Sequence, residues 1–125
     1  MENETPGIIL LTYKGKVLLM HKQNGVLDEQ KHPWTFIGGV RGKREPLKKT
    51  IERSIKKEMG IDIKNIEQIS EYCYYAPLTD DNVNNIKRGE HQLLDFFNPG
   101  ELGKLFLSRP TKDFLNKYWS LIPNQ

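Results

Sequence analysis

The residues of this chain with the clearest chemistry lie in the segment 38–61, GGVRGKREPLKKTIERSIKKEMGI. Carboxylates spaced three or four residues apart on a helix project to one side, where they hold divalent cations that prefer oxygen ligands. Such a cation neutralises clustered phosphate charge and lowers the pKa of an attacking water. Glu58 suits this chemistry, but the neighbouring positions hold Ser54 and Lys57. The segment therefore indicates a metal-assisted phosphate hydrolase that lacks two of its expected ligands.

A longer pattern surrounds these three positions. It consists of Gly39, Glu45, Arg53, Ile55, Glu58, Gly60 and Ile61. This pattern resembles the Nudix box, G-x5-E-x7-R-E-U-x-E-E-x-G-U with U aliphatic, and every spacing is kept. The flanking sequences are similar to the family as well. HPWTFIGG resembles its Trp-x-x-Pro-Gly-Gly lead-in, with Ile37 where proline is usual, and HQLLDFFNPGELGKL resembles its strand-then-helix segment. Ser54 and Lys57 replace two glutamates, so the box is degenerate.

The resemblance implies a Nudix-type α/β/α sandwich with a mixed central sheet, in the α+β or α/β class. It also implies hydrolysis of a phosphoanhydride in a nucleoside diphosphate linked to another moiety, with Mg²⁺ or Mn²⁺ as cofactor. Ser54 and Lys57 make that activity weak or atypical, because serine alone is a poor magnesium ligand and an ammonium repels a divalent cation. Two alternatives stay open: an inert fold that binds a nucleotide or phosphorylated metabolite, and a protein-interaction module.

The resemblance assigns catalytic roles to Glu58, Glu45 and Arg53. It assigns metal binding to Glu58 together with a carboxylate from a distant loop, for which Glu90 is the first candidate. The other candidates for that ligand are Asp80, Asp81 and Glu71. Arg53 is expected to brace the loop through a salt bridge with Glu45.

Each of these residues also has a simpler interpretation. Glu45 could act only by placing a negative charge near the N-terminus of the helix, where the helix dipole is positive. Glu58 could pair with Lys57 or Arg53 instead of a metal. Lys57 either occupies the place of the missing cation or points into solvent, and the sequence does not separate these two.

Five residues are candidates for substrate binding. They are Gly38, Gly39, Arg41, Trp34 and Tyr74. The glycine pair lets the backbone approach a neighbour closely. The aromatic rings either stack on a base or pack in the core, since alternation along a strand sends some of them inward. The expected partner is a small-molecule nucleotide or phosphorylated metabolite.

The elements that must position these residues follow from apolar periodicity. Residues 7–13 and 16–21 predict a strand hairpin, and 34–37 a short strand before the glycine pair. An apolar residue at every fourth position from Leu47 to Met59 predicts a helix over 46–59, which Gly60 ends. A broken strand region is expected over 61–79 and a strand over 91–97. A helix is expected at 101–106. Another is expected near the C-terminus, with one face shared by Phe114, Leu115, Tyr118, Trp119 and Ile122. Loops are expected at 22–33 and 80–89.

Composition limits the remaining possibilities. The 125 residues suit a single domain over 1–125. One cysteine and an N-terminus without a basic signal region fit a cytoplasmic protein, and no apolar run is long enough to cross a membrane. The net charge is +3, but residues 41–57 carry +6 and the rest −3. This basic patch attracts phosphates, although no nucleic-acid motif accompanies it. The family resemblance is compatible with a homodimer.

Overall fold

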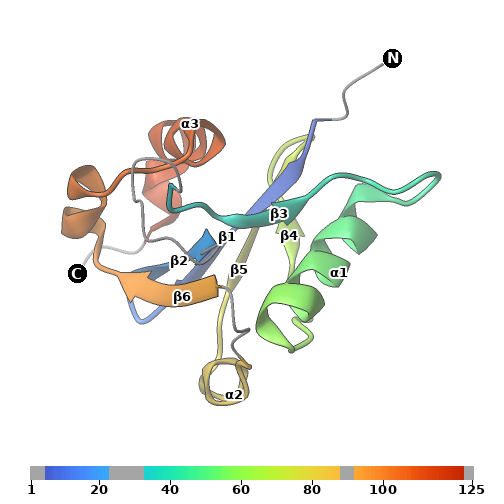
Figure 1. Ribbon diagram of the computed structural model, residues 1–125, viewed down its shortest axis with the longest axis horizontal. Helices are drawn as coiled ribbons and strands as arrows, with labels where there is room; N and C mark the ends of the chain where they lie inside the picture. The colour runs from blue at the N-terminus through green and yellow to red at the C-terminus, as the bar shows by residue number, and fades with distance from the viewer. Residues whose placement is uncertain (1–4, 23–32, 88–91, 123–125) are drawn as a thin grey trace.

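The computed structural model describes residues 5–22, 33–87 and 92–122. Within these ranges six strands form a mixed sheet in the order β4-β5-β1-β2-β6, with β3 paired to β1 (Figure 1). β1 (Gly7–Tyr13) and β2 (Lys16–Lys22) form the expected antiparallel hairpin. β5 (Cys73–Pro77) runs parallel to β1 and makes the sheet mixed.

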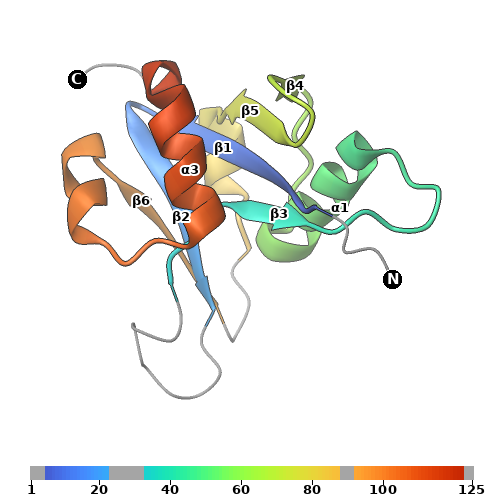
Figure 2. The same cartoon turned by 90° about the horizontal axis from the view of Figure 1, so that it is seen from above.

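Alternation along β1 sends apolar side chains to both faces of the sheet. Ile9 and Leu11 belong to the core on one face, and Leu10 belongs to the core on the other. α1 (Leu47–Met59) packs on the first face and α3 (Arg109–Tyr118) on the second. Figure 2 shows α3 lying across β1 and β2, away from α1. The expected sandwich with a mixed sheet is confirmed.

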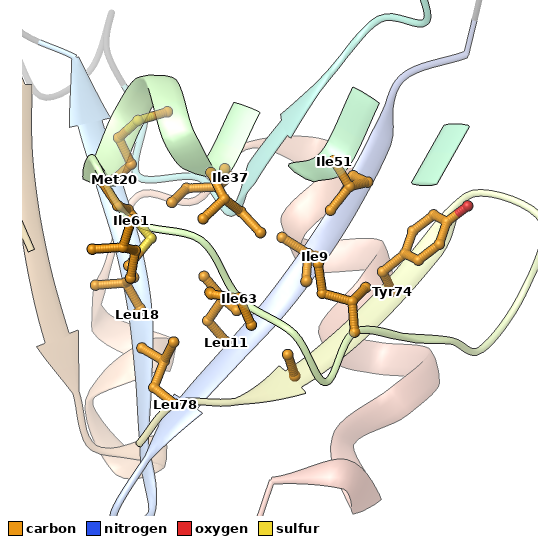
Figure 3. Close-up of a cluster of buried hydrophobic side chains, with 14 of the residues drawn as sticks. Ile9, Leu11, Leu18, Met20, Ile37, Ile51, Ile61, Ile63, Tyr74 and Leu78 are labelled. Atoms are coloured by element: carbon orange, nitrogen blue, oxygen red, sulfur yellow. The ribbon is translucent and has the colours of Figure 1, made fainter. Parts of the chain in front are cut away.

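The apolar stripe of α1 anchors the helix on the sheet. Ile51, Ile55 and Met59 have no exposed surface, and Figure 3 shows Ile51 beside Ile9 and Ile37 in the core. Gly60 ends the helix with a φ of 72°, and its N–H donates to a carbonyl in the last turn. The expected helix over 46–59 is therefore confirmed, with its first residue as the N-cap.

The remaining described elements complete the sheet and its covers. They are β3 (Ile37–Gly39), β4 (Glu67–Gln68), α2 (Asp80–Asn84), β6 (Gln92–Phe97) and the 3-10 helices η1 (Pro99–Lys104) and η2 (Trp119–Leu121). The broken strand region over 61–79 thus becomes β4 and β5. None of the helices in the described ranges combines the length and apolar character needed to cross a bilayer.

Three sequence expectations about these elements were wrong in detail. The loop expected over 80–89 begins with α2, because Thr79 and Asn82 form a capping box around its first turn. The short strand expected over 34–37 lies later, as β3, because pairing with β1 continues through both glycines. Trp119, expected to share one face of the C-terminal helix with Phe114 and Leu115, lies after the end of α3 at Tyr118 and is about half exposed, whereas those two residues are buried.

Candidate functional site

The loop between β3 and α1 is held by one carboxylate. Glu45 Oε1 accepts hydrogen bonds from Gly42 N at 3.0 Å, Thr50 Oγ1 at 2.7 Å and Arg53 Nη2 at 2.8 Å. Glu45 Oε2 accepts from Arg53 Nε at 3.1 Å. The expected salt bridge between Arg53 and Glu45 is thus present. Hydrogen bonds from Arg53, Thr50 and Gly42 lower the pKa of Glu45 to about 2.

This bonding pattern decides what Glu45 can do. A carboxylate offers roughly four lone-pair positions, and Glu45 accepts four hydrogen bonds. Oε1 accepts three of these bonds and Oε2 accepts one, so the brace engages both oxygens. The geometry therefore supports a bracing role for Glu45 and Arg53, and a catalytic role for either stays a prediction.

The glycine pair lets β3 approach two neighbours closely. A methyl group added at Gly38 would overlap with the carbonyl oxygen of Gly7, on the adjacent β1. One added at Gly39 would lie 2.6 Å from Ser54 Oγ, on α1. Only glycine avoids both contacts. The expectation of close backbone approach is confirmed here for packing within the protein, and substrate binding by the pair stays a prediction.

Three polar side chains on α1 line up beside β3. Thr50, Ser54 and Glu58 recur every four residues, and all are buried, with Ser54 6% and Glu58 9% exposed. We call these three residues the polar row. It adjoins the apolar stripe on the same helix, and the close contact with Gly39 places it against the end of β3. Glu58 is therefore buried on the side of α1 that meets the glycine pair.

Lys57 lies outside the buried face. Its side chain is exposed, whereas Ser54, three residues earlier, and Glu58, the next residue, are both buried. Of the two interpretations of Lys57, the structure favours the one in which its ammonium reaches solvent. Lys57 follows Ser54 by three residues, so the two positions are neighbours on the surface of the helix.

The candidate ligands from distant loops do not gather at Glu58 in the described part of the chain. Asp80 accepts from Tyr13 Oη at 2.6 Å and pairs with Lys14 at 3.8 Å, beside the β1–β2 turn. Asp81 is exposed in α2. Glu90, the first candidate, lies outside the described residues.

Arg41 and Glu71 are brought together elsewhere. Together with Thr5, Leu47 and Tyr72 they line a cavity of about 300 Å³ between the loop before α1 and the turn before β5. Arg41 is exposed. This cavity gives Arg41, a predicted substrate-binding residue, a concave and polar setting, and its contact with substrate stays a prediction.

The two aromatic candidates, Tyr74 and Trp34, both pack against the cores of the protein. Tyr74 is 2% exposed in the core beneath α1 (Figure 3), and burial raises the pKa of its phenol. Trp34 is half-buried, with ring centroids 4.9 Å from His21 and 4.9 Å from Phe97. For Tyr74 the structure favours core packing over stacking on a base. Tyr72 is exposed at the cavity beside Arg41.

The residues described here do not fit a divalent metal. Among them, no group of three or more histidine, cysteine or acidic side chains is placed to hold an ion. In the polar row only Glu58 is a carboxylate, and Glu45 is engaged by the brace. Magnesium and manganese need several oxygen ligands. One buried carboxylate flanked by a serine and a lysine does not supply them.

Sequence reasoning missed Thr50. Its hydroxyl donates to Glu45 and its side chain is completely buried, so it belongs to both the brace and the polar row. The signal was present in the sequence, because Thr50 precedes Ser54 and Glu58 at the same four-residue spacing. Sequence reasoning weighed only residues with metal-binding chemistry at that spacing and passed over a hydroxyl.

Comparison with known proteins places this geometry in context. A family model of the NUDIX domain matches residues 1–118. No protein of curated function matches the chain significantly. A mutT/nudix family protein from Listeria innocua is similar in structure, with a TM-score of 0.70, 16% identity, and coverage of 98% of this chain and 95% of that one.

Two further solved structures are similar over nearly their whole lengths. A NUDIX family hydrolase from Clostridium perfringens has a TM-score of 0.70 at 14% identity, with 98% and 100% of the two chains covered. The NUDIX domain of Shewanella oneidensis NrtR, solved in complex with ADP ribose, has a TM-score of 0.69 at 14% identity, with 98% and 91% covered. At such identities the likeness concerns the fold.

Proposed function

The chain belongs to the Nudix family, and from this premise we propose that it binds a nucleoside diphosphate linked to another moiety and hydrolyses the phosphoanhydride slowly. The family generally uses a divalent metal, but the described residues do not fit one. We therefore assign no step to a metal. Slow turnover, rather than efficient turnover, is what this set of side chains supports.

One observation carries the proposal: the scaffold of the site is intact although its acidic residues are not. Glu45 and Arg53 hold the loop to α1 through two hydrogen bonds, and Gly39 lies against Ser54. These contacts position the polar row beside β3. Glu58 is the carboxylate of that row, and we assign it the role of orienting the attacking water.

A second candidate function is binding without hydrolysis. Ser54 and Lys57, at positions where the family pattern has glutamates, favour it. The structurally similar NUDIX domain of Shewanella oneidensis NrtR was solved with ADP ribose, which makes ADP-ribose a suitable first probe for this chain.

Hydrolysis and binding are tested together with one panel of compounds. Nucleoside triphosphates, ADP-ribose and dinucleoside polyphosphates are incubated with the protein in Mg²⁺ and in Mn²⁺, and phosphate or nucleotide release is measured. We expect at least one compound to be cleaved faster by wild type than by Glu58→Gln. Glu52→Gln is the matched control, because Glu52 lies on the same helix and pairs on the outside with Lys49 at 3.5 Å.

The outcomes separate the two functions. Equal rates for wild type and Glu58→Gln across the panel would remove the hydrolase proposal. Calorimetric binding of a panel member without turnover would leave the second candidate. A panel that shows neither turnover nor binding would contradict both.

A further inference from the structure

A row of basic residues runs along α1 next to the polar row. Lys49, Arg53 and Lys57 recur every four residues and all three are exposed. At 3.6 residues per turn, Lys57 lies about 60° from Ser54 around the helix axis, and Glu58 lies about 100° from Lys57 on the other side of Ser54. Ser54 therefore separates an ammonium from a carboxylate.

The two sides of Ser54 attract ligands of opposite charge. Arg53 donates to Glu45 through Nε and Nη2, and its Nη1 is not used in that contact, while 54% of its side chain is exposed. Guanidinium and ammonium groups one turn apart can bind one phosphate group between them. The surrounding segment 41–57 carries a net charge of +6, so phosphates are drawn to this side of the helix.

The side of Ser54 that carries the Glu58 carboxylate does not attract phosphate. Glu58 is an acidic residue that is 9% exposed, so it offers phosphate no attraction, and no group of three or more histidine, cysteine or acidic side chains in the described ranges is placed to hold a divalent cation. A phosphate placed toward Lys57 avoids Glu58, whereas a metal placed at Glu58 would have the Lys57 ammonium nearby. Beside Ser54 itself these two charges offset each other, so the preference for an anion comes from the Arg53 and Lys57 side, where segment 41–57 carries a net charge of +6.

We infer that the diphosphate of the ligand binds directly to the Lys57 side of α1, contacting Lys57 and Arg53 without a divalent cation. This inference rests on the proposed function, since it takes a nucleoside diphosphate as the ligand. Lys57 and Arg53 then supply the positive charge that offsets the diphosphate, from the exposed side of α1. The substitution of a glutamate by a lysine at this position changes how the phosphates are bound and does not merely remove a ligand.

Calorimetric titration with ADP-ribose and with inorganic pyrophosphate tests this, once in EDTA and once in Mg²⁺ at equal ionic strength. We expect wild type to bind in EDTA, with an affinity that Mg²⁺ changes by less than about threefold. Lys57→Glu should weaken binding in EDTA by about tenfold or more. Glu58→Gln should change binding in EDTA by less than about threefold, because Glu58 lies on the other side of Ser54 from Lys57.

Lys56→Glu is the matched control. Lys56 is exposed in the same turn of α1, so the same charge change affects the helix dipole equally, but it points away from the polar row toward Asp62 at 3.6 Å. Its effect should stay within about threefold. Equal losses from Lys56→Glu and Lys57→Glu would show diffuse attraction and overturn the site. Thermal unfolding of each variant confirms that these exposed changes preserve the fold.

The double variant Ser54→Glu with Lys57→Glu adds a readout that is independent of activity. It should lose ADP-ribose binding in EDTA and bind Mn²⁺ at least tenfold more tightly than wild type. Binding of wild type in Mg²⁺ but not in EDTA, or loss of binding in Glu58→Gln, would overturn the inference while the proposed function stands. If neither probe binds in either medium, the inference is overturned. If the compound panel also shows neither turnover nor binding, the proposed function is overturned as well.

Discussion

At the scale of the residue, the carboxylate of Glu45 braces the loop between β3 and α1. It collects donors from the loop backbone, from the Thr50 hydroxyl and from the Arg53 guanidinium. These bonds require the ionised form of the carboxyl group. The pKa of Glu45 therefore falls to about 2 from its ordinary value of 4.5, and the stability of the loop depends on pH.

The sign of this dependence is fixed by linkage. A carboxyl group with a lowered pKa in the folded state stabilises the fold above its unfolded pKa and loses that contribution as the pH falls through the folded one. Glu45→Gln should therefore be less stable than wild type at pH 7. The difference should shrink as the pH drops below 4.5 and disappear near 2. Urea denaturation at a series of pH values measures it.

Glu52→Gln serves as the control for this experiment. Its carboxylate makes an exposed pair with Lys49, which contributes little to stability at any pH. A difference between Glu45→Gln and wild type that persists unchanged at low pH would show that the brace does not depend on the charge of Glu45.

At the scale of the element, the shape of the candidate site depends on how closely α1 approaches β3. The two glycines of β3 meet different obstacles: Gly38 faces the backbone oxygen of Gly7, and Gly39 faces the Ser54 hydroxyl. A backbone atom in a paired strand cannot move without breaking the sheet, whereas a hydroxyl can rotate. The same substitution should therefore have different costs at the two positions.

Gly38→Ala should destabilise the fold by about 3 kcal/mol and Gly39→Ala by about 1 kcal/mol, the two ends of the range for overpacking. In a Ser54→Ala background the cost of Gly39→Ala should fall close to zero, because the nearest remaining side-chain atoms lie 3.5 Å and 3.8 Å away. The cost of Gly38→Ala should not change in that background. Chemical denaturation of the six proteins measures both, and additive effects at Gly39 and Ser54 would contradict the contact.

At the scale of the whole molecule, one sheet supports two cores. The α1 side contains the residues beneath the candidate site, and the α3 side contains Phe36, Phe114 and Leu115. The Phe114 ring packs against Phe36 with centroids 5.1 Å apart and against Tyr118 at 5.2 Å. Because both cores share β1 and β2, loss of packing on the α3 side should weaken the entire fold while leaving the geometry at α1 intact.

Phe114→Ala should lower the free energy of unfolding by about 3–5 kcal/mol, as expected for a fully buried phenylalanine. Phe106→Ala is the control, since Phe106 is 45% exposed, and its effect should be within about 0.5 kcal/mol. Circular dichroism during denaturation measures both. In conditions where Phe114→Ala remains folded, its affinity for ADP-ribose should equal that of wild type, and a weakened affinity would show that the α3 side takes part in the site.

Several features of the site were predictable because the physics that produces them is local. The four-residue apolar spacing of α1, the stop at Gly60 and the pairing of Glu45 with Arg53 all arise within a few turns of chain. Such contacts depend on helical period and on the charges of near neighbours, which the sequence displays directly. The mixed sheet and the helices on its faces followed from the resemblance to a known family.

The sequence by itself determined the composition of the α1 edge: a scaffold with Ser54, Lys57 and Glu58 at its functional positions. Tertiary structure decided that Tyr74 packs inward, that Lys57 faces solvent, and that Gly39 meets Ser54. The reason is that burial depends on which distant segments pack together. Alternation along a strand places neighbouring side chains on opposite faces of the sheet. Which face is buried depends on where the helices pack.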